Sequence, residues 1–185
     1  GPVAQSIFPA DGSVNAEFST ASVDDVNEAI EKAELAWRSS AWRQSLPHQR
    51  AQVLYKVADI IAERAEALSQ LQTRDNGKPH AETMALEMSA VATARYVAAA
   101  CETMDGELTS QRAADFMTMS VYEPVGVVAA VTPWNSPIAS EVQKLAPALA
   151  GGNAVILKPA QETSLIVLEL AKIFEEAGLP KGLLS

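Results

Sequence analysis

Apolar residues in the first hundred positions recur at the spacing of amphipathic helices. The first such stretch follows a turn at Pro9–Gly12, and it is preceded by Ser22, whose hydroxyl is well suited to cap a helix. Its apolar positions recur every three or four residues: Val26, Ile30, Ala33 and Trp37. This pattern predicts an amphipathic helix.

Two further helices are predicted before residue 105. One begins near Pro47 and ends at Asn76–Pro79, where Gly suits a left-handed cap and Pro prevents continuation. Its apolar stripe consists of Leu54, Val57, Ile61 and Leu68. The next helix spans about 81 to 104, and its stripe of Met84, Met88 and Val91 is expected to pack in the core.

The isolated cysteine and histidines of this region predict no chemistry. Cys101 lies near the end of the third helix without a basic neighbour in sequence that would lower the pKa of its thiol, which indicates an inert buried side chain. His48 and His80 stand alone at helix starts, and we expect both on the surface. No Cys/His cluster has the spacing of metal ligands, so no metal is predicted.

Residues 108 to 124 change to the period of a half-exposed strand. Met117, Met119 and Val121 alternate with polar or amphipathic side chains, which predicts a β arm. No partner strand lies nearby in sequence. The arm is therefore expected either to join a sheet formed later in a longer chain or to pair with another subunit.

The last third of the chain has the pattern of a βαβα unit. Residues 124 to 131 form a nearly continuous apolar run, which is typical of a strand buried on both faces of a parallel sheet. A helix opening at Ser136–Pro137 and ending at Gly151–Gly152 then presents one apolar stripe: Ile138, Val142, Leu145 and Leu149. A second strand over 153 to 157 and a helix over about 163 to 177 follow.

The fold class predicted is α/β, with N-terminal helices packed on an incomplete Rossmann-like parallel sheet and a β arm. A right-handed crossover places both strand ends, and the loops after them, at one edge of the sheet, where ligands bind. Only two buried strands are identifiable. Because so small a sheet has poorly covered edges, the chain by itself is expected to be marginal, to self-associate or to be completed by another chain.

Composition and charge exclude some classes of partner. The net charge of −9 disfavours a nucleic-acid partner or an anionic membrane surface. The longest apolar runs are far shorter than a membrane span requires, and no membrane partner is expected. A single cysteine fits a reducing compartment, so a cytoplasmic location is expected.

The two loops that follow the predicted strands hold the residues suited to chemistry. They are Thr132–Asn135 and Lys158–Gln161. A tryptophan, a neutral amide and a lysine converging at a sheet edge suit a nucleotide and a developing oxyanion. Asn before a helix can equally be a cap, and Lys-Pro can be an ordinary loop, so spacing alone leaves both interpretations open.

At these loops the sequence resembles the aldehyde dehydrogenase superfamily. Five segments match family motifs in order and spacing: Glu123–Val128, Thr132–Asn135, Lys144–Asn153, Lys158–Ala160 and Glu176–Pro180. The resemblance extends upstream through Asn76–Pro79 and covers essentially the whole chain. It implies NAD(P)-dependent oxidation of an aldehyde to an acid, in which a cysteine thiolate attacks the carbonyl, hydride passes to nicotinamide, and water activated by a glutamate hydrolyses the thioester.

The resemblance also implies roles for individual residues. Asn135 donates its side-chain amide to the oxyanion, and Lys158 binds the hydroxyls of the adenosine ribose. The remaining residues expected around the cofactor are Thr132, Pro133, Trp134, Pro159, Ala160 and Gln161. Lys144 either belongs to a proton relay near the nucleophile or is a solvated lysine on the polar face of its helix.

Three features depart from the family or limit the prediction. Ser136 replaces the aromatic residue usual after the Asn, which leaves the aldehyde unidentified. Gln161 stands where NAD-preferring relatives commonly carry a glutamate, so NADP is expected to be used beside NAD, and a preference for NADP stays open as an alternative. The nucleophilic cysteine, general base and phosphate-binding turn of the family are absent, and Cys101 is not the nucleophile.

These observations predict that the chain is one segment of a homo-oligomeric aldehyde dehydrogenase. Residues 1–107 are expected to form the helical part of the cofactor domain, residues 108–124 the arm of the oligomerisation domain, and residues 125–185 the first βαβα unit. Two alternatives stay open. The chain could be a non-catalytic binding or association module, or its parent could release an acyl-CoA instead of an acid.

Overall fold

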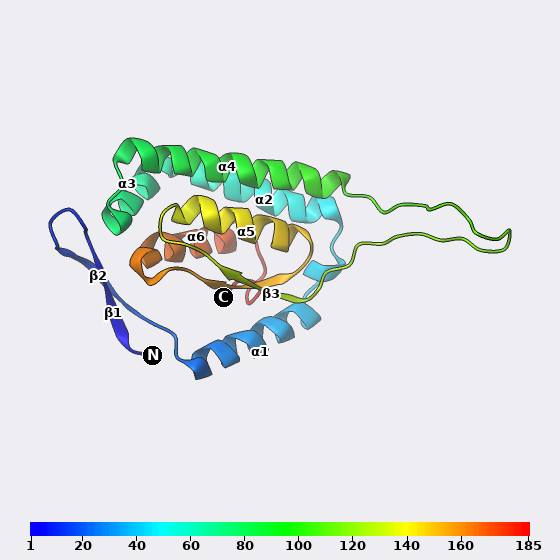
Figure 1. The fold of residues 1–185 in the computed structure, drawn as a ribbon, viewed down its shortest axis with the longest axis horizontal. Coiled ribbons are helices and arrows are strands. Elements are labelled where there is room, and N and C mark those ends of the chain that lie inside the picture. The colour runs from blue at the N-terminus through cyan, green and yellow to red at the C-terminus, as the bar shows by residue number, and fades with distance from the viewer.

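The computed structural model describes residues 1–185, which form a small hairpin, a helical body and a long projecting arm (Figure 1). The helices and strands are, in order, β1 (Val3–Ile7), β2 (Val14–Ser19), α1 (Val23–Ser39), η1 (Trp42–Gln44), α2 (Pro47–Glu63), α3 (Ala65–Asn76), α4 (His80–Thr103), β3 (Val127–Val131), α5 (Pro137–Ala150), β4 (Ala154–Lys158), η2 (Gln161–Thr163) and α6 (Ser164–Glu176). The predicted α/β class is confirmed. No helix is long and apolar enough to cross a membrane.

The parallel pair β3–β4 lies between helices on both sides. Helices α5 and α6 cover one face, with α2 and α4 packed outside them, and α1 runs along the other face (Figure 1). Trp37 of α1 donates its indole N–H to the carbonyl of Gly152 at 2.9 Å, and Trp42 donates to Leu149 O at 3.1 Å. These two tryptophans attach the N-terminal helix to the α5–β4 turn.

The core is densest around α5. The four residues predicted to face inward from this helix, Ile138, Val142, Leu145 and Leu149, are all fully buried. Each buried side chain of this size contributes roughly 1.5–3 kcal/mol relative to exposure. Burial of this stripe therefore fixes α5, and with it the loop that leads into α5.

The first twenty residues form an antiparallel hairpin that the sequence pattern did not reveal. Strands β1 and β2 are joined at the predicted turn, where Gly12 has φ 77° and Asp11 accepts from the backbone N–H of Ser13 at 2.8 Å. The hairpin buries little besides Ser6, so it has no clear apolar alternation. The N-terminal part of the chain is consequently not wholly helical.

The helix predicted from Pro47 to the Asn76 turn is interrupted. Arg64, with φ −104° and ψ 10°, separates α2 from α3, and its guanidinium forms hydrogen bonds of 2.7 and 2.8 Å with the Glu176 carboxylate. The apolar spacing continues across the break because only one residue leaves helical geometry. Gly77 adopts the expected left-handed cap with φ 77°.

The face predicted for α4 is partly wrong. Met88 is 50% exposed, because the buried side of the helix is lined mostly by small residues: Thr83, Glu87, Ala90, Val91, Ala94, Ala98 and Cys101. Small side chains allow α4 to pack closely on α2 and α5, and the methionine is left outside. The predictions for Cys101, His48 and His80 are confirmed, since the thiol is buried and both histidines are exposed.

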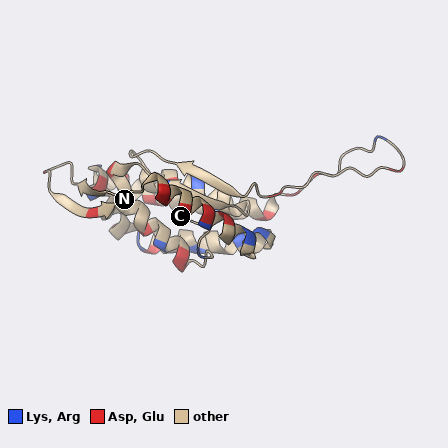
Figure 2. Cartoon of the chain, turned by 90° about the horizontal axis from the view of Figure 1, so that it is seen from below, with Lys and Arg blue, Asp and Glu red and all other residues tan.

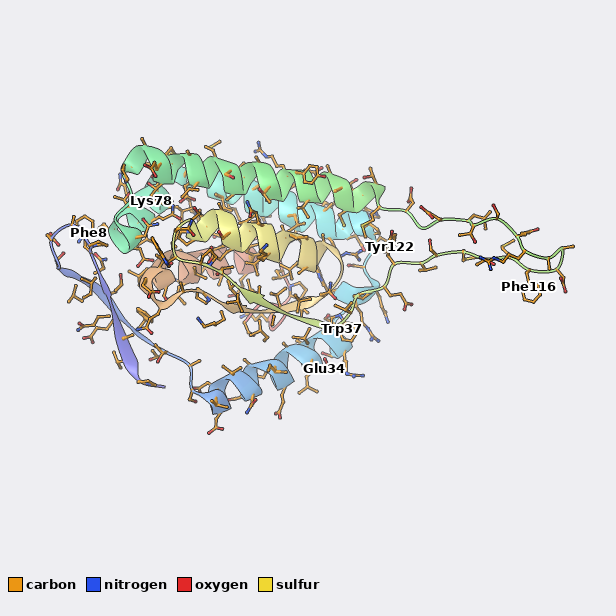
Figure 3. All side chains as sticks on the ribbon, in the orientation of Figure 1. Phe8, Glu34, Trp37, Lys78, Phe116 and Tyr122 are labelled. Atoms are coloured by element: carbon orange, nitrogen blue, oxygen red, sulfur yellow. The ribbon has the colours of Figure 1, made fainter.

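The arm between α4 and β3 is extended but barely paired. Its two limbs meet at one isolated bridge, Leu108 with Met119, and at backbone hydrogen bonds such as Ser120 N to Glu107 O at 2.8 Å. Every residue from 102 to 123 is exposed. Phe116 lies near the tip of the arm and Tyr122 at its base (Figure 3), and single charged residues are scattered along the arm (Figure 2). A regular strand with one buried face is therefore not observed here.

The sheet differs from the prediction in two ways: it has one additional strand pairing, and one face of β3 is exposed. Leu184 bridges Val155 in parallel, with hydrogen bonds of 2.7 Å from Val155 N to Leu183 O and from Leu157 N to Ser185 O. The prediction that the first strand is buried on both faces is wrong for this chain, because Ala129 and Val131 are exposed. Helix α1 reaches only part of that face.

Candidate functional site

The loops after β3 and β4 leave the same edge of the sheet. The strands run parallel with Val131 paired to Lys158, and the N–H of Thr132 donates to the carbonyl of Lys158 at 3.2 Å. Both loops therefore start side by side, as the right-handed βαβ reasoning predicts. The roles expected of the individual site residues stay predictions at this point.

An open cleft of about 620 Å³ lies beside these loops. Trp134 from the first loop and Gln161 from the second both line it, together with Glu162. The opposite wall comes from the hairpin and from the end of α3. Trp134 is 57% exposed and offers an apolar surface at the cleft.

Thr132, the first residue of the β3 loop, is buried beneath the surface of the site. Its hydroxyl donates to Glu141 Oε1 at 2.6 Å, and Glu141 lies on the fully buried face of α5. Burial raises the pKa of Glu141 to about 7, although the hydrogen bond from Thr132 acts in the opposite direction. A carboxyl that changes charge near neutrality thus lies directly under the loop.

Asn135 projects from the loop and is exposed. The residue that caps α5 is Ser136, and no side chain forms a cap hydrogen bond at this helix start. The alternative interpretation of Asn135 as a helix cap therefore finds no support in the geometry. Asn135 is not among the residues that line the cleft, but its exposed, unengaged amide is available to donate to a ligand.

The two candidate lysines are both exposed. Lys158 Nζ contacts only the carbonyl of Pro159, at 3.2 Å, so its charge is available at the sheet edge. Lys144 lies on the solvent side of α5 and forms no salt bridge. Neither lysine lines the cleft described above. Pro133 is exposed, and Pro159 and Ala160 are half-buried at the base of their loop.

Three buried polar residues that hold the site together were missed by the sequence analysis. They are Glu141, Gln72, whose Oε1 accepts from Ile138 N at 3.2 Å, and Asp75. Asp75 accepts from the Ser6 hydroxyl at 2.8 Å and from the N–H of Leu165 at 2.9 Å. Burial raises the pKa of Asp75 despite these bonds. Only Glu141 could have been found from the sequence, because it is an acidic residue within the apolar stripe of a predicted helix.

Comparison with known proteins places these features in a family. The model of the aldehyde dehydrogenase family matches residues 2–185. The chain is 38% identical over 180 residues to (Z)-2-((N-methylformamido)methylene)-5-hydroxybutyrolactone dehydrogenase of Acinetobacter baylyi, covering 97% of this chain and 37% of that protein. It is 39% identical over 183 residues to phenylacetaldehyde dehydrogenase of Pseudomonas fluorescens, covering 96% and 36%.

A solved structure supports the same assignment. Betaine aldehyde dehydrogenase of Staphylococcus aureus in complex with NAD⁺ superposes with a TM-score of 0.95 at 34% identity, covering 98% of this chain and 36% of that one. The chain belongs to the aldehyde dehydrogenase family, and it spans little more than a third of the length of these relatives.

Proposed function

We propose that this chain supplies the oxyanion donor and part of the cofactor site of an NAD(P)-dependent aldehyde dehydrogenase. The observation that carries the proposal is the pair of loops at one sheet edge, where Asn135 and Lys158 are both exposed and Trp134 and Gln161 line one cleft. Their order and spacing match the family over its whole N-terminal segment.

In the proposed reaction an aldehyde carbonyl is attacked by a thiolate, and the carbonyl oxygen becomes an oxyanion. The Asn135 amide stabilises this charge, because an amide donates without titrating. Loss of one such donor costs roughly 3 kcal/mol of transition-state stabilisation. Family resemblance also offers Lys144 for a proton relay, although its position on the solvent side of α5 fits a solvated lysine equally well.

The thiolate of this reaction does not come from Cys101. Its Sγ lies 3.5 Å from the carbonyls of Pro47 and Ala150, and burial raises the pKa of the thiol. Ala150 closes α5 at the end opposite to the Asn135 loop. The nucleophile and the general base are therefore proposed to belong to the remainder of a full-length enzyme.

The residues at the sheet edge fit a dinucleotide cofactor. Lys158 offers an uncompensated ammonium to ribose hydroxyls, and the exposed Trp134 offers an apolar wall. Thr132, Pro133, Pro159 and Ala160 form the backbone that holds these side chains at the edge. The cofactor, when bound, accepts the hydride that leaves the substrate carbon.

We propose in addition that the enzyme uses NADP appreciably. Gln161 carries no charge, and its amide can accept from a ribose hydroxyl or donate to a 2′-phosphate. The neighbouring Glu162 lines the same cleft. Its carboxylate opposes the added phosphate, so the preference depends on which of the two side chains approaches the 2′ position.

A second function, association without catalysis, is favoured by one specific observation. The arm exposes apolar side chains on both of its limbs, among them Leu108, Phe116, Met119 and Val121. We propose that the arm is covered in a homo-oligomer of the enzyme. In the association-only alternative the same surface acts alone, and the chain oxidises no aldehyde. The cytoplasmic location expected from the single cysteine stays a prediction.

The product of the full-length protein separates these possibilities. The protein is incubated with NAD or NADP and a panel of aliphatic and aromatic aldehydes in H₂¹⁸O, with and without coenzyme A, and the products are identified by mass spectrometry. A carboxylic acid carrying a newly acquired ¹⁸O supports hydrolytic aldehyde oxidation, because the final step adds water to a thioester. An acyl-CoA product indicates the acylating alternative. If no aldehyde of the panel gives a product, the proposal that the protein is an aldehyde dehydrogenase is refuted.

A further inference from the structure

The loop that carries Asn135 is held at its first residue by a buried pair. Thr132 is 4% exposed and Glu141 is fully buried, and 2.6 Å separate the Thr132 hydroxyl from Glu141 Oε1. This distance is typical of a hydroxyl donating to a carboxylate. The backbone N–H of Thr132 is also engaged, with Lys158 O, so both polar groups of this residue are fixed.

The other end of the same stretch is held from α3. The N–H of Ile138, in the first turn of α5, has no acceptor within the helix. It donates to Gln72 Oε1 at 3.2 Å, and Gln72 is fully buried. Trp134 and Asn135 thus lie within seven residues whose two ends are tied by buried side chains. Such anchoring limits the positions that the Asn135 amide can take.

A glutamate at position 141 is less favourable for the stability of the fold than an apolar residue would be. Its neighbours on the stripe, Ile138, Val142 and Leu145, are apolar and fully buried, and its second oxygen, Oε2, has no hydrogen-bond partner in the chain. A buried acid with one unsatisfied oxygen destabilises a fold unless the bond it makes serves another purpose. The one side-chain hydrogen bond of Glu141 is with Thr132, the first residue of the loop that carries Asn135.

We infer that Glu141 is a positioning residue, which acts through the Thr132 hydroxyl to hold the Asn135 loop in its catalytic position. The inference rests on the proposed function for its kinetic readout, whereas the Thr132–Glu141 clamp itself is independent of catalysis. Glu141 touches neither substrate nor cofactor in this assignment.

The charge state of Glu141 adds a pH dependence to this role. The pKa of about 7 means that the group ionises across neutral pH, and a carboxylate accepts from Thr132 more strongly than the neutral acid does. The clamp therefore tightens as pH rises through about 7. Ionisable or charged groups on the elements packed around this region include Glu87 of α4, Asp75 of α3, Arg50 of α2, Lys158 of β4, Lys144 of α5 itself, and Glu169 and Lys172 of α6. None of them supplies a cation that contacts the Glu141 carboxyl.

The test uses four variants of the full-length enzyme: Thr132→Val, Glu141→Leu, the double variant, and Glu141→Gln. We expect Thr132→Val and Glu141→Leu each to lower kcat about tenfold with little change in the KM for cofactor, and the double variant to lose no more than either. Glu141→Gln keeps an acceptor, so it should recover most of kcat while losing the rise of kcat around pH 7. Glu87→Gln is the control, since it removes a second buried acid outside the loop and should preserve that rise.

Melting temperatures supply a readout that needs no activity. Because Thr132→Val is nearly isosteric, it should fold even where Glu141→Leu does not. If the clamp exists, Thr132→Val should lower Tm in the wild-type background. In the Glu141→Gln background at low pH the same substitution should lower Tm by less, because only a weaker hydrogen bond to the Gln amide is lost. Independent additive losses of kcat, or the same loss in Glu141→Gln as in Glu141→Leu, would overturn the positioning role. If wild-type enzyme oxidises no aldehyde, the proposed function fails and the clamp is decided by the Tm data.

Discussion

Asn135 and Lys158 lie at the same sheet edge but are expected to act on different parts of the reaction. Asn135→Ala in the full-length enzyme should lower kcat/KM by about 10²-fold or more while cofactor affinity stays nearly unchanged, because the amide acts mainly in the transition state. Lys158→Ala should mainly weaken cofactor binding. Both effects are measured by steady-state turnover and by equilibrium titration with NAD and NADP.

Matched controls exist for both substitutions on the surface of the same molecule. Gln143→Ala removes an exposed amide from α5, and Lys56→Ala removes an exposed ammonium from α2. Neither should change kcat/KM or cofactor affinity. Equal losses of cofactor affinity in Asn135→Ala and Lys158→Ala would contradict the division of roles.

Gln161 is expected to weaken discrimination against NADP. The wild-type enzyme should show appreciable kcat/KM with NADP, and Gln161→Glu should shift the ratio of the two kcat/KM values toward NAD, because an added carboxylate repels a 2′-phosphate. Glu162→Gln, at the neighbouring cleft position, should shift the ratio toward NADP. A wild type that already rejects NADP, with no response to Gln161→Glu, would show that position 161 does not read the 2′ position.

At the residue scale, exposed functional groups were easier to predict than buried supporting ones. Trp134 and Asn135 follow β3, and Lys158 ends β4, each in a short motif, so their place at the sheet edge could be predicted from local sequence. Gln72 and Asp75 act on groups 66 and 90 residues away, and no local pattern records such partners. Glu141 interrupts an apolar stripe and could have been noticed, but its bond to Thr132 depends on how β3 packs against α5.

At the scale of the element, α4 contains a buried acid that makes the stability of the protein depend on pH. Glu87 is fully buried, neither of its oxygens has a hydrogen-bond partner in the chain, and burial raises its pKa to about 8. A raised pKa means that the stability contributed is complete below the unfolded value of 4.5 and is lost as pH rises through about 8. The unfolding free energy should then fall with rising pH by up to about 1.4 kcal/mol per pH unit in that window.

This pH dependence is measured by urea unfolding of the full-length protein between pH 5 and 8. Glu87→Gln should reduce the dependence, because the amide keeps the shape of the side chain and does not titrate, whereas Glu141, whose pKa is raised to about 7 by burial, retains its own contribution. Glu102→Gln, an exposed change on the same helix, should leave the slope as in the wild type. A slope unaffected by Glu87→Gln would mean that Glu87 is not the group responsible.

Helices were predicted more accurately than strands because their signals are local. The start of α1 and the bounds of α4, α5 and α6 agree with the prediction to within a residue or two. The hairpin was missed because it buries almost nothing, and the break at Arg64 was missed because one non-helical residue preserves the apolar spacing. Val26 and Ile30 of α1, Met88 of α4 and the outer face of β3 are exposed for a common reason. An apolar residue shows that a surface can be buried, and it does not show that this chain buries it.

For the whole molecule, exposed apolar side chains lie on the arm and around β3, and also along α1 and on the hairpin. Val125 is 84% exposed and Val131 68%, beside the apolar residues of the arm. Surface of this kind is expected to be covered by the remaining strands of a complete cofactor domain and by another subunit. The isolated chain should consequently be marginally stable or self-associating.

Activity of the isolated chain and of the full-length enzyme is the most direct test of the central claim, namely that these residues hold the oxyanion donor and cofactor loops but not the nucleophile. NAD(P)H formation is followed at 340 nm for both proteins with the same aldehydes. We expect turnover by the full-length enzyme, full retention of that turnover in Cys101→Ala, and none by the isolated chain. Steady NAD(P)H formation by the isolated chain, abolished by Cys101→Ala, would contradict it.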